Sequence, residues 1–212
     1  MDDDRSTAQT TANGASTTAQ QAAASLREDG ALEPHIDQHG TLPLKPADDS
    51  YQRLVVSLLR QQVSIASAEA VRERLFTQFD VTPETMLAAD PDRLASVGLS
   101  AAKVEYIKST ARAFQENGYS RESFGALDDE AVREELTEIR GVGPWTAKMF
   151  LIYALGRPDV FAVEDLGIRR GIELVCDREM TRGEMVDRAK KWRPYRSYAS
   201  LYLWRAYEGD TL

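Results

Sequence analysis

The sequence predicts an all-α protein, and three observations support this. Apolar residues recur at helical spacing from about residue 25 onward, and no segment after residue 45 shows the sustained alternation of a strand. Residues that favour helix starts and glycines that favour helix ends separate these periodic segments. The chain has 212 residues and a hydrophobic content of 42%, which suits one domain or two small lobes around a real core.

The first 24 residues have a different composition from the rest of the chain. They are mainly Thr, Ala, Gln and Asp, with almost no large apolar side chains. Such a segment cannot bury enough apolar surface to offset the entropy lost on ordering. We therefore expect a disordered tail over 1–24 and a folded domain over 25–212.

Several helices are expected in the first half of the folded part. Leu54, Leu58 and Gln61 lie at helical spacing within 49–62. Four later helices begin at a residue that commonly caps or starts a helix. These residues are Ser64, Pro83, Pro91 and Ser100. The helix that begins at Ser100 is expected to end at Gly118, since glycine favours helix ends.

The next two helices form a predicted helix-hairpin-helix segment, at about 129–155. Acidic residues at 128–130 place negative charge in the first turn of its first helix, where the helix dipole favours it. Pro144 at the first position and Gly156 after the last turn delimit the second helix, 144–155.

Two glycines build the turn of this hairpin. Gly141 and Gly143 flank Val142, and glycine permits positive φ angles and the close approach of another backbone. Amides near the start of the second helix would then face outward without partners, which makes an anion site. These amides belong to Val142, Gly143, Trp145 and Thr146. The alternative is a packing corner in which the glycines only permit close helix contact.

Charge and cysteine content restrict the possible functions. The net charge of −8 and the pI near 4.9 argue against a polyanionic partner, although binding depends on where the charges lie. A Lys-poor acidic surface also suits a protein adapted to high salt. With Cys176 as its single cysteine, the chain forms no internal disulfide and no four-thiolate zinc or iron–sulfur site.

The chain lacks the sequence signals of a membrane or secreted protein. It has no run of about eighteen apolar residues, and acidic residues stand at its start in place of an apolar signal segment. We expect a cytoplasmic protein with no membrane partner.

Five segments, in the same order along the chain, resemble one protein family. The segments "IRGVGPWTAKMF" and "VFAVEDLGIRRG" are similar to the helix-hairpin-helix, glycine/proline-rich, aspartate (HhH-GPD) superfamily of DNA glycosylases. "LVVSLLRQQVSIASA" and "LASVGLSAAKVEYIKSTARAF" resemble its earlier segments, and "WRPYRSYASLYLWR" resembles its alkylated-base (DNA-3-methyladenine glycosylase II) branch. The resemblance covers about residues 35–208. It implies a two-lobed helical fold in which the hairpin and Asp165 line a cleft.

Asp165 matches the catalytic aspartate of this family. A fixed carboxylate in a dry site stabilises the positive charge that develops on the sugar, and it can position or deprotonate water. The alternative is that Asp165 only caps the helix that follows it. The two roles are compatible, because a capping carboxylate is ionised and rigid.

Trp145 stands where strand-nicking relatives carry a lysine that attacks the sugar through a Schiff base. We therefore expect a monofunctional enzyme with no lyase activity, and Lys148 is expected to face solvent or phosphate. The single Cys176 excludes the four-cysteine cluster of endonuclease III-like relatives.

The resemblance also implies a base pocket. Trp145 and Trp204 match pocket positions, and their rings would stack on a cationic alkylated base. Tyr198 and Tyr202 are expected to be structural. Met149 and Leu166 depart from the family pattern, which leaves the substrate range open.

The remaining predicted site residues contact DNA or an ion. Gln61 and Gln62 match the loop that fills the void left by a flipped base, although they also suit an exposed helix end. Arg140, Lys148 and Arg169 are candidate phosphate contacts, together with the amides of the hairpin. The resemblance implies a Na⁺ or K⁺ ion on main-chain carbonyls, here those of Thr137, Ile139 and Val142, and no other cofactor.

We therefore expect a monomeric DNA glycosylase that hydrolyses the N-glycosidic bond of alkylated or deaminated purines in double-stranded DNA. One alternative is the same fold acting on uracil, mismatched or oxidised bases. Another is a non-catalytic helix-hairpin-helix DNA-binding module in which Asp165 is only a cap.

Overall fold

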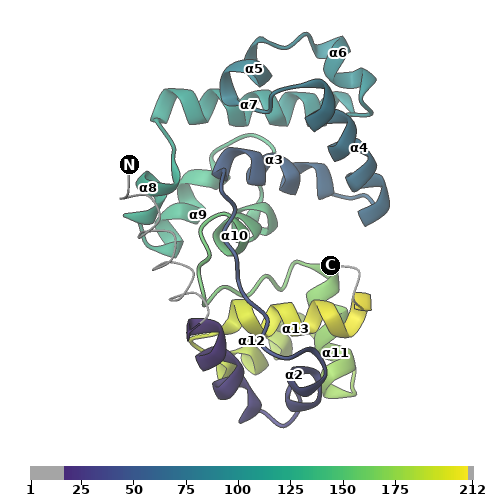
Figure 1. Ribbon diagram of the computed structural model, residues 1–212, viewed down its shortest axis with the longest axis vertical. Helices are drawn as coiled ribbons and strands as arrows, with labels where there is room; N and C mark the ends of the chain where they lie inside the picture. Colours follow the sequence, from purple (N-terminus) through teal and green to yellow (C-terminus); the bar gives the residue numbers. More distant parts are fainter. Residues whose placement is uncertain (1–16, 210–212) are drawn as a thin grey trace, which may run out of the picture. The chain divides into compact units, whose positions relative to one another are not determined.

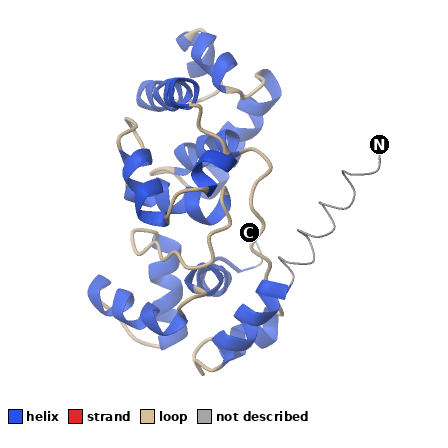
Figure 2. Cartoon of the chain, turned by 90° about the vertical axis from the view of Figure 1, so that its left-hand side faces the viewer, coloured by secondary structure: helices blue, strands red, loops and turns tan. Residues whose placement is uncertain are grey.

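The computed structural model describes residues 17–209, and in this range every regular element is a helix (Figures 1 and 2). The all-α prediction is confirmed. The described chain divides into two compact units. One unit is 46–155, and the other combines 17–45 with 156–209. Within 17–209 no helix is long and apolar enough to cross a bilayer.

The unit 46–155 contains eight helices. They are α3 (Ser50–Arg60), α4 (Ile65–Gln78), α5 (Pro83–Ala88), α6 (Pro91–Ser96), α7 (Ala101–Asn117), α8 (Arg121–Gly125), α9 (Asp129–Thr137) and α10 (Pro144–Tyr153). Helix α3 packs against α4, α7 and α10, and α9 packs against α10. Five aromatic rings pack against one another in this unit, and all but that of Tyr119 are buried. They belong to Tyr51, Phe114, Tyr119, Phe124 and Phe150.

The helix starts predicted at Ser64, Pro83, Pro91 and Ser100 and the helix end predicted at Gly118 are confirmed in this unit. The hydroxyls of Ser64 and Ser100 each accept a backbone N–H three residues ahead, as N-caps do. Pro83 and Pro91 lie in the first turns of α5 and α6, and Gly118 ends α7 with a φ of 61°. These boundaries depend on local chemistry, which explains why the sequence alone reveals them.

The second unit brings together both ends of the described chain. It contains a helical segment at 17–27, α2 (Glu33–His39), α11 (Leu166–Cys176), α12 (Arg182–Ala189), the 3₁₀ turn η1 (Lys190–Trp192) and α13 (Arg196–Glu208). Helix α13 packs most extensively on α11 and also contacts α2 (Figure 1).

The expected disordered tail is wrong for residues 17–24, which belong to the helical segment 17–27. Ala19, Ala22, Ala23 and Leu26 are buried, and they follow the i, i+3, i+4, i+7 spacing of a helix face. This stripe consists mostly of alanine, so it lacks the large side chains that mark a core helix, although alanine is the best helix former. The rest of the predicted tail, 1–16, lies outside the described residues.

Candidate functional site

Asp165 is the N-cap of α11. Its backbone is extended, with φ −71° and ψ 131°, and its carboxylate oxygen Oδ1 accepts the backbone N–H of Ile168 at 2.9 Å. The capping role predicted for this residue is confirmed. The same oxygen accepts the indole N–H of Trp204 from α13 at 2.8 Å. Two donors from different helices thus hold one carboxylate oxygen.

The segment that leads to Asp165 is attached to the start of α13. Ser197 is fully buried, and its hydroxyl donates to the carbonyl of Arg157 at 2.6 Å and accepts the amide of Val160 at 3.0 Å. Beside it, the Arg196 guanidinium donates from Nε to Asp159 Oδ1 at 2.7 Å and from Nη2 to Asp159 Oδ2 at 3.0 Å. A bidentate ion pair of this kind fixes the relative orientation of the two side chains and also pairs their charges. Helix α13 therefore anchors this segment both near residue 159 and at Asp165.

Two glycines let α11 and α13 approach closely. A Cβ atom on Gly171 would lie 2.1 Å from the carbonyl oxygen of Leu203, and one on Gly167 would lie 2.7 Å from Cδ1 of Trp204. Neither position has room for a side chain. Because a backbone carbonyl cannot move aside, the glycine at 171 sets the distance between the two helices.

The two glycines of the hairpin turn have different surroundings. Gly141 has a φ of 93°, and a Cβ there would lie 2.2 Å from Cγ of Tyr106 on α7. Gly143 has a φ of −98°, and apart from its chain neighbours no atom of the described residues lies within 4 Å of the position its Cβ would take. The fold therefore explains the first glycine and leaves space beside the second.

One part of the amide prediction is wrong. Val142 is buried, and its N–H donates to the carbonyl of Ile139 at 3.0 Å, so it does not face outward.

Helix α10 begins as predicted, with Pro144 in its first turn and Gly143 as an N-cap that contributes no side-chain hydrogen bond. It ends at Tyr153, two residues before the predicted end.

The structure gives different surroundings to the two glutamines that were predicted to fill the void left by a flipped base. The side-chain amide of Gln61 donates to the carbonyl of Gly141 at 2.9 Å and to the hydroxyl of Thr146 at 2.8 Å. Gln61 therefore ties the end of α3 to the hairpin, and the buried Thr146 side chain serves as its acceptor. Gln62 is exposed and has a φ of 56°. Of the two glutamines, Gln62 therefore remains the candidate for filling the void left by a flipped base.

The candidate phosphate contacts lie in different environments. Arg140 is exposed and pairs with Glu105 of α7 at 3.0 Å. Lys148 is half-buried on α10, and Arg169 donates to the carbonyl of Glu164 at 3.2 Å. Arg140 is the most exposed of the three side chains.

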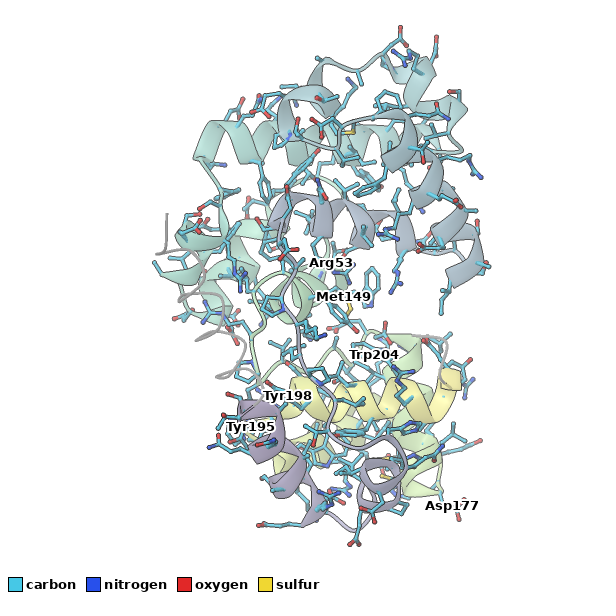
Figure 3. The ribbon with its side chains drawn as sticks, viewed as in Figure 1. Arg53, Met149, Asp177, Tyr195, Tyr198 and Trp204 are labelled. Atoms are coloured by element: carbon cyan, nitrogen blue, oxygen red, sulfur yellow. The ribbon has the colours of Figure 1, made fainter. Side chains whose placement is uncertain are left out.

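The aromatic predictions are tested in part. Tyr202 is buried, and its hydroxyl donates to the carbonyl of Gly40 at 2.9 Å, which ties α13 to the end of α2. Tyr198 is buried near Tyr195, and burial raises its pKa above the usual value (Figure 3). Both are structural, as predicted. Trp145 is half-buried, whereas Trp204 is 4% exposed and its N–H is engaged by Asp165.

Sequence reasoning did not identify Tyr106, Ser197 or the paired Arg196 and Asp159 as residues that shape the site. Ser197 and Arg196 lie within the motif "WRPYRSYASLYLWR", but their partners are 37 to 40 residues away. Nothing in a single sequence indicates such pairings.

Comparisons with known proteins show which family the chain belongs to. Residues 55–194 match the HhH-GPD superfamily of base excision DNA repair proteins. The chain is 36% identical over 208 residues to the DNA-3-methyladenine glycosylase of Saccharomyces cerevisiae, covering 88% of this chain and 70% of that protein. A Bacillus subtilis relative is 31% identical over 188 residues, and the alignment covers 84% of this chain and 66% of that protein.

A solved structure is also similar. The 3-methyladenine DNA glycosylase of Schizosaccharomyces pombe, in complex with abasic DNA, superposes with a TM-score of 0.81 at 27% identity. The match covers 87% of this chain and 95% of that one. The chain therefore belongs to the HhH-GPD superfamily of base-excision DNA repair proteins, and its relatives place it in the alkylated-base glycosylase branch that its motifs predict.

Proposed function

We propose that this protein is a monofunctional DNA glycosylase that removes alkylated or deaminated purines from double-stranded DNA and leaves an abasic site. The observation that carries the proposal is the Asp165 carboxylate, which the Ile168 amide and the Trp204 indole hold at the start of α11. Two N–H donors on one oxygen hold the carboxylate in place and limit its rotation.

The chemistry follows from the charge of this group. Breaking the bond between base and sugar develops positive charge on the sugar, and a fixed carboxylate stabilises that charge without reorganising. A cationic alkylated purine leaves as a neutral base and needs no proton, whereas a deaminated purine must gain a proton, which water can supply, to leave as a neutral base. Water then adds to the sugar carbon, and Asp165 orients it and accepts its proton. The products are a free base and a sugar with an intact phosphodiester chain.

The absence of a lysine before Thr146 supports a hydrolytic mechanism. Trp145 occupies that place, and an indole cannot form a Schiff base with the sugar. Trp145 lies half-buried in the first turn of α10, where its ring is suited to stack on an extruded base. This assignment predicts that borohydride traps no covalent adduct between the protein and DNA.

Binding to double-stranded DNA is proposed to rest on the hairpin and the loop after α3. The start of α10 presents the positive end of a helix dipole, and the space beside Gly143 permits close approach of a phosphate. Gln62 is exposed and is the side chain proposed to fill the void of a flipped nucleotide. Because the net charge is −8, we expect few neutralised phosphates and a shallow dependence of affinity on salt.

A monovalent cation is proposed on the carbonyls of Thr137, Ile139 and Val142. The Ile139 carbonyl accepts the Val142 amide at 3.0 Å, and a carbonyl oxygen retains a second lone pair for an ion. Carbonyl oxygens are suitable ligands for Na⁺ or K⁺, and this supports the proposal. When bound, the ion would add positive charge beside the phosphate site.

A panel of lesion duplexes tests the proposal. The duplexes carry 3-methyladenine, 7-methylguanine, hypoxanthine, ethenoadenine or uracil, and free base is measured together with strand integrity before and after alkali. The expected result is release of alkylated or deaminated purines, with strand breaks only after alkali. Release confined to uracil would favour the alternative substrate class. Tight duplex binding without release of any base would favour a binding module.

A further inference from the structure

We propose that Trp204 is a positioning residue for Asp165 and that its indole N–H sets the orientation of the carboxylate. The proposal rests on the proposed function, because it assumes that Asp165 faces the reacting sugar. It differs from the role of Trp204 expected from sequence, in which the indole ring is a stacking surface for the base.

The first observation is the hydrogen bond itself. Trp204 Nε1 lies 2.8 Å from Asp165 Oδ1, and the two residues are 39 positions apart. An indole nitrogen can only donate, and a buried donor needs an acceptor. Trp204 is 4% exposed, so the carboxylate supplies an acceptor for a buried donor.

The second observation is that both donors reach the same oxygen. The Ile168 amide lies 2.9 Å from Oδ1 and belongs to α11, whereas the indole belongs to α13. The amide alone would cap the helix and still leave the carboxylate free to turn about its terminal bond. The second donor restricts this rotation and thereby sets the direction of the other oxygen, Oδ2. A carboxylate that must face one sugar carbon benefits from this restriction.

The third observation is that α11 is shaped to fit this indole. A Cβ atom on Gly167 would lie 2.7 Å from Cδ1 and 3.0 Å from Nε1 of Trp204. Gly167 lies two residues after Asp165 and is buried, so the indole rests on the first turn of the helix that Asp165 caps. The absence of a side chain at 167 lets the indole nitrogen reach the carboxylate.

The same unit contains a matched control. Trp192 Nε1 donates to Asp29 Oδ2, also at 2.8 Å, and Trp192 is 1% exposed. Burial would raise the pKa of Asp29, but hydrogen bonds from Arg188 and Trp192 hold it below the usual value. This second pair of indole and carboxylate connects the segment before α2 to η1 and includes no predicted site residue.

The test compares Trp204→Phe with Trp192→Phe, since each variant keeps an aromatic ring and removes one N–H. Base release is measured under single-turnover conditions, and duplex affinity is measured separately. Trp204→Phe is expected to slow release about 10- to 100-fold and to change affinity less than about twofold. Trp192→Phe is expected to lower the unfolding temperature and leave release by the folded protein unchanged.

The opposite pattern would overturn the proposal. If the indole is only a stacking surface, Trp204→Phe retains a ring and keeps most of the release rate, whereas Trp204→Leu weakens binding of the lesion duplex. An unchanged release rate in Trp204→Phe therefore rejects the positioning role.

A spectroscopic measurement separates this inference from the proposed function. In protein labelled with ¹⁵N at the indole nitrogens, the Trp204 N–H signal is identified by its loss in Trp204→Phe. Asp165→Asn should move this signal and leave that of Trp192 in place, whereas Asp29→Asn should do the reverse. A Trp204 signal that does not respond to Asp165→Asn rejects the contact. Failure of the wild type to release any base would instead reject the proposed function.

Discussion

The hairpin and the Asp165 segment are built in different ways. In the hairpin, the amides of Ile139, Val142 and Ala147 donate to carbonyls three or four residues earlier. The Asp165 segment receives the side chains of Ser197 and Trp204 from α13, 37 to 40 residues away. Local bonds make the hairpin turn, and long-range bonds place the carboxylate.

This difference has a consequence for mutation. A change in the hairpin is expected to act on a turn made by local bonds and on its contacts with Gln61 and Tyr106. A change in the Asp165 segment is expected to act on its bonds to side chains of α13. The four predictions below compare residues that are proposed to act on DNA with residues that only support the fold.

The largest effect is expected for Asp165→Asn. Asparagine caps helices as well as aspartate does, so the fold and duplex binding should persist. The charge that stabilises the sugar cation is lost, and base release should fall at least about 100- to 1,000-fold. Single-turnover release and the melting temperature are the two measurements. A release rate within tenfold of wild type would reject the assigned mechanism.

The next effect is expected within the turn. Gly141→Ala places a Cβ at a φ of 93° and 2.2 Å from the Tyr106 ring. Backbone strain and displacement of the ring should together destabilise the protein by about 2–4 kcal/mol in a denaturant titration.

Gly143→Ala is the matched control for this variant. Its φ of −98° suits alanine and the space around it is open, so the free energy of unfolding should change by less than about 1 kcal/mol. Affinity for duplex DNA should nevertheless fall, because the added methyl group occupies the space proposed for the phosphate. Equal losses of stability in the two variants would contradict the difference described between the two glycines.

Ser197→Ala breaks the anchor before Asp165. The variant leaves the buried Val160 amide and the Arg157 carbonyl without this partner, at a cost of about 1–3 kcal/mol. Ser200→Ala is the control, because Ser200 is equally buried but donates to the Arg196 carbonyl within its own helix. It should cost clearly less, since that carbonyl also belongs to the helix ladder. A smaller cost for Ser197→Ala would show that the anchor does not stabilise this unit.

The smallest effects compare two adjacent glutamines. Gln61→Ala removes two hydrogen bonds to the hairpin and should lower stability by about 1–2 kcal/mol. Gln62→Ala should change stability by less than about 0.5 kcal/mol, because the residue is exposed, yet slow the release of a base that must be flipped. If Gln62→Ala releases base at the wild-type rate, Gln62 is not the side chain that fills the void of the flipped nucleotide.

The sequence predictions succeeded where a side chain caps a helix and failed at two other places. The helix starts at Ser64, Ser100 and Asp165 were predictable because a capping side chain acts on amides two or three residues away. The helix at 17–27 was missed because its buried face is mostly alanine, a composition that a disordered segment can share. The prediction that the Val142 amide faces outward was wrong, because this amide donates to the Ile139 carbonyl within the turn.

The sequence by itself determined the helical class, the turn and helix starts of the hairpin, the aspartate at a helix N-cap and the lack of a lysine before Thr146. All of these depend on residue types at short spacing, where local chemistry dominates. Only the tertiary structure decided that Gln61 is an internal tie, that Gly141 is needed for Tyr106, and that Trp204 donates to Asp165. These contacts join residues 35 to 85 positions apart, and they form only when helices pack side by side.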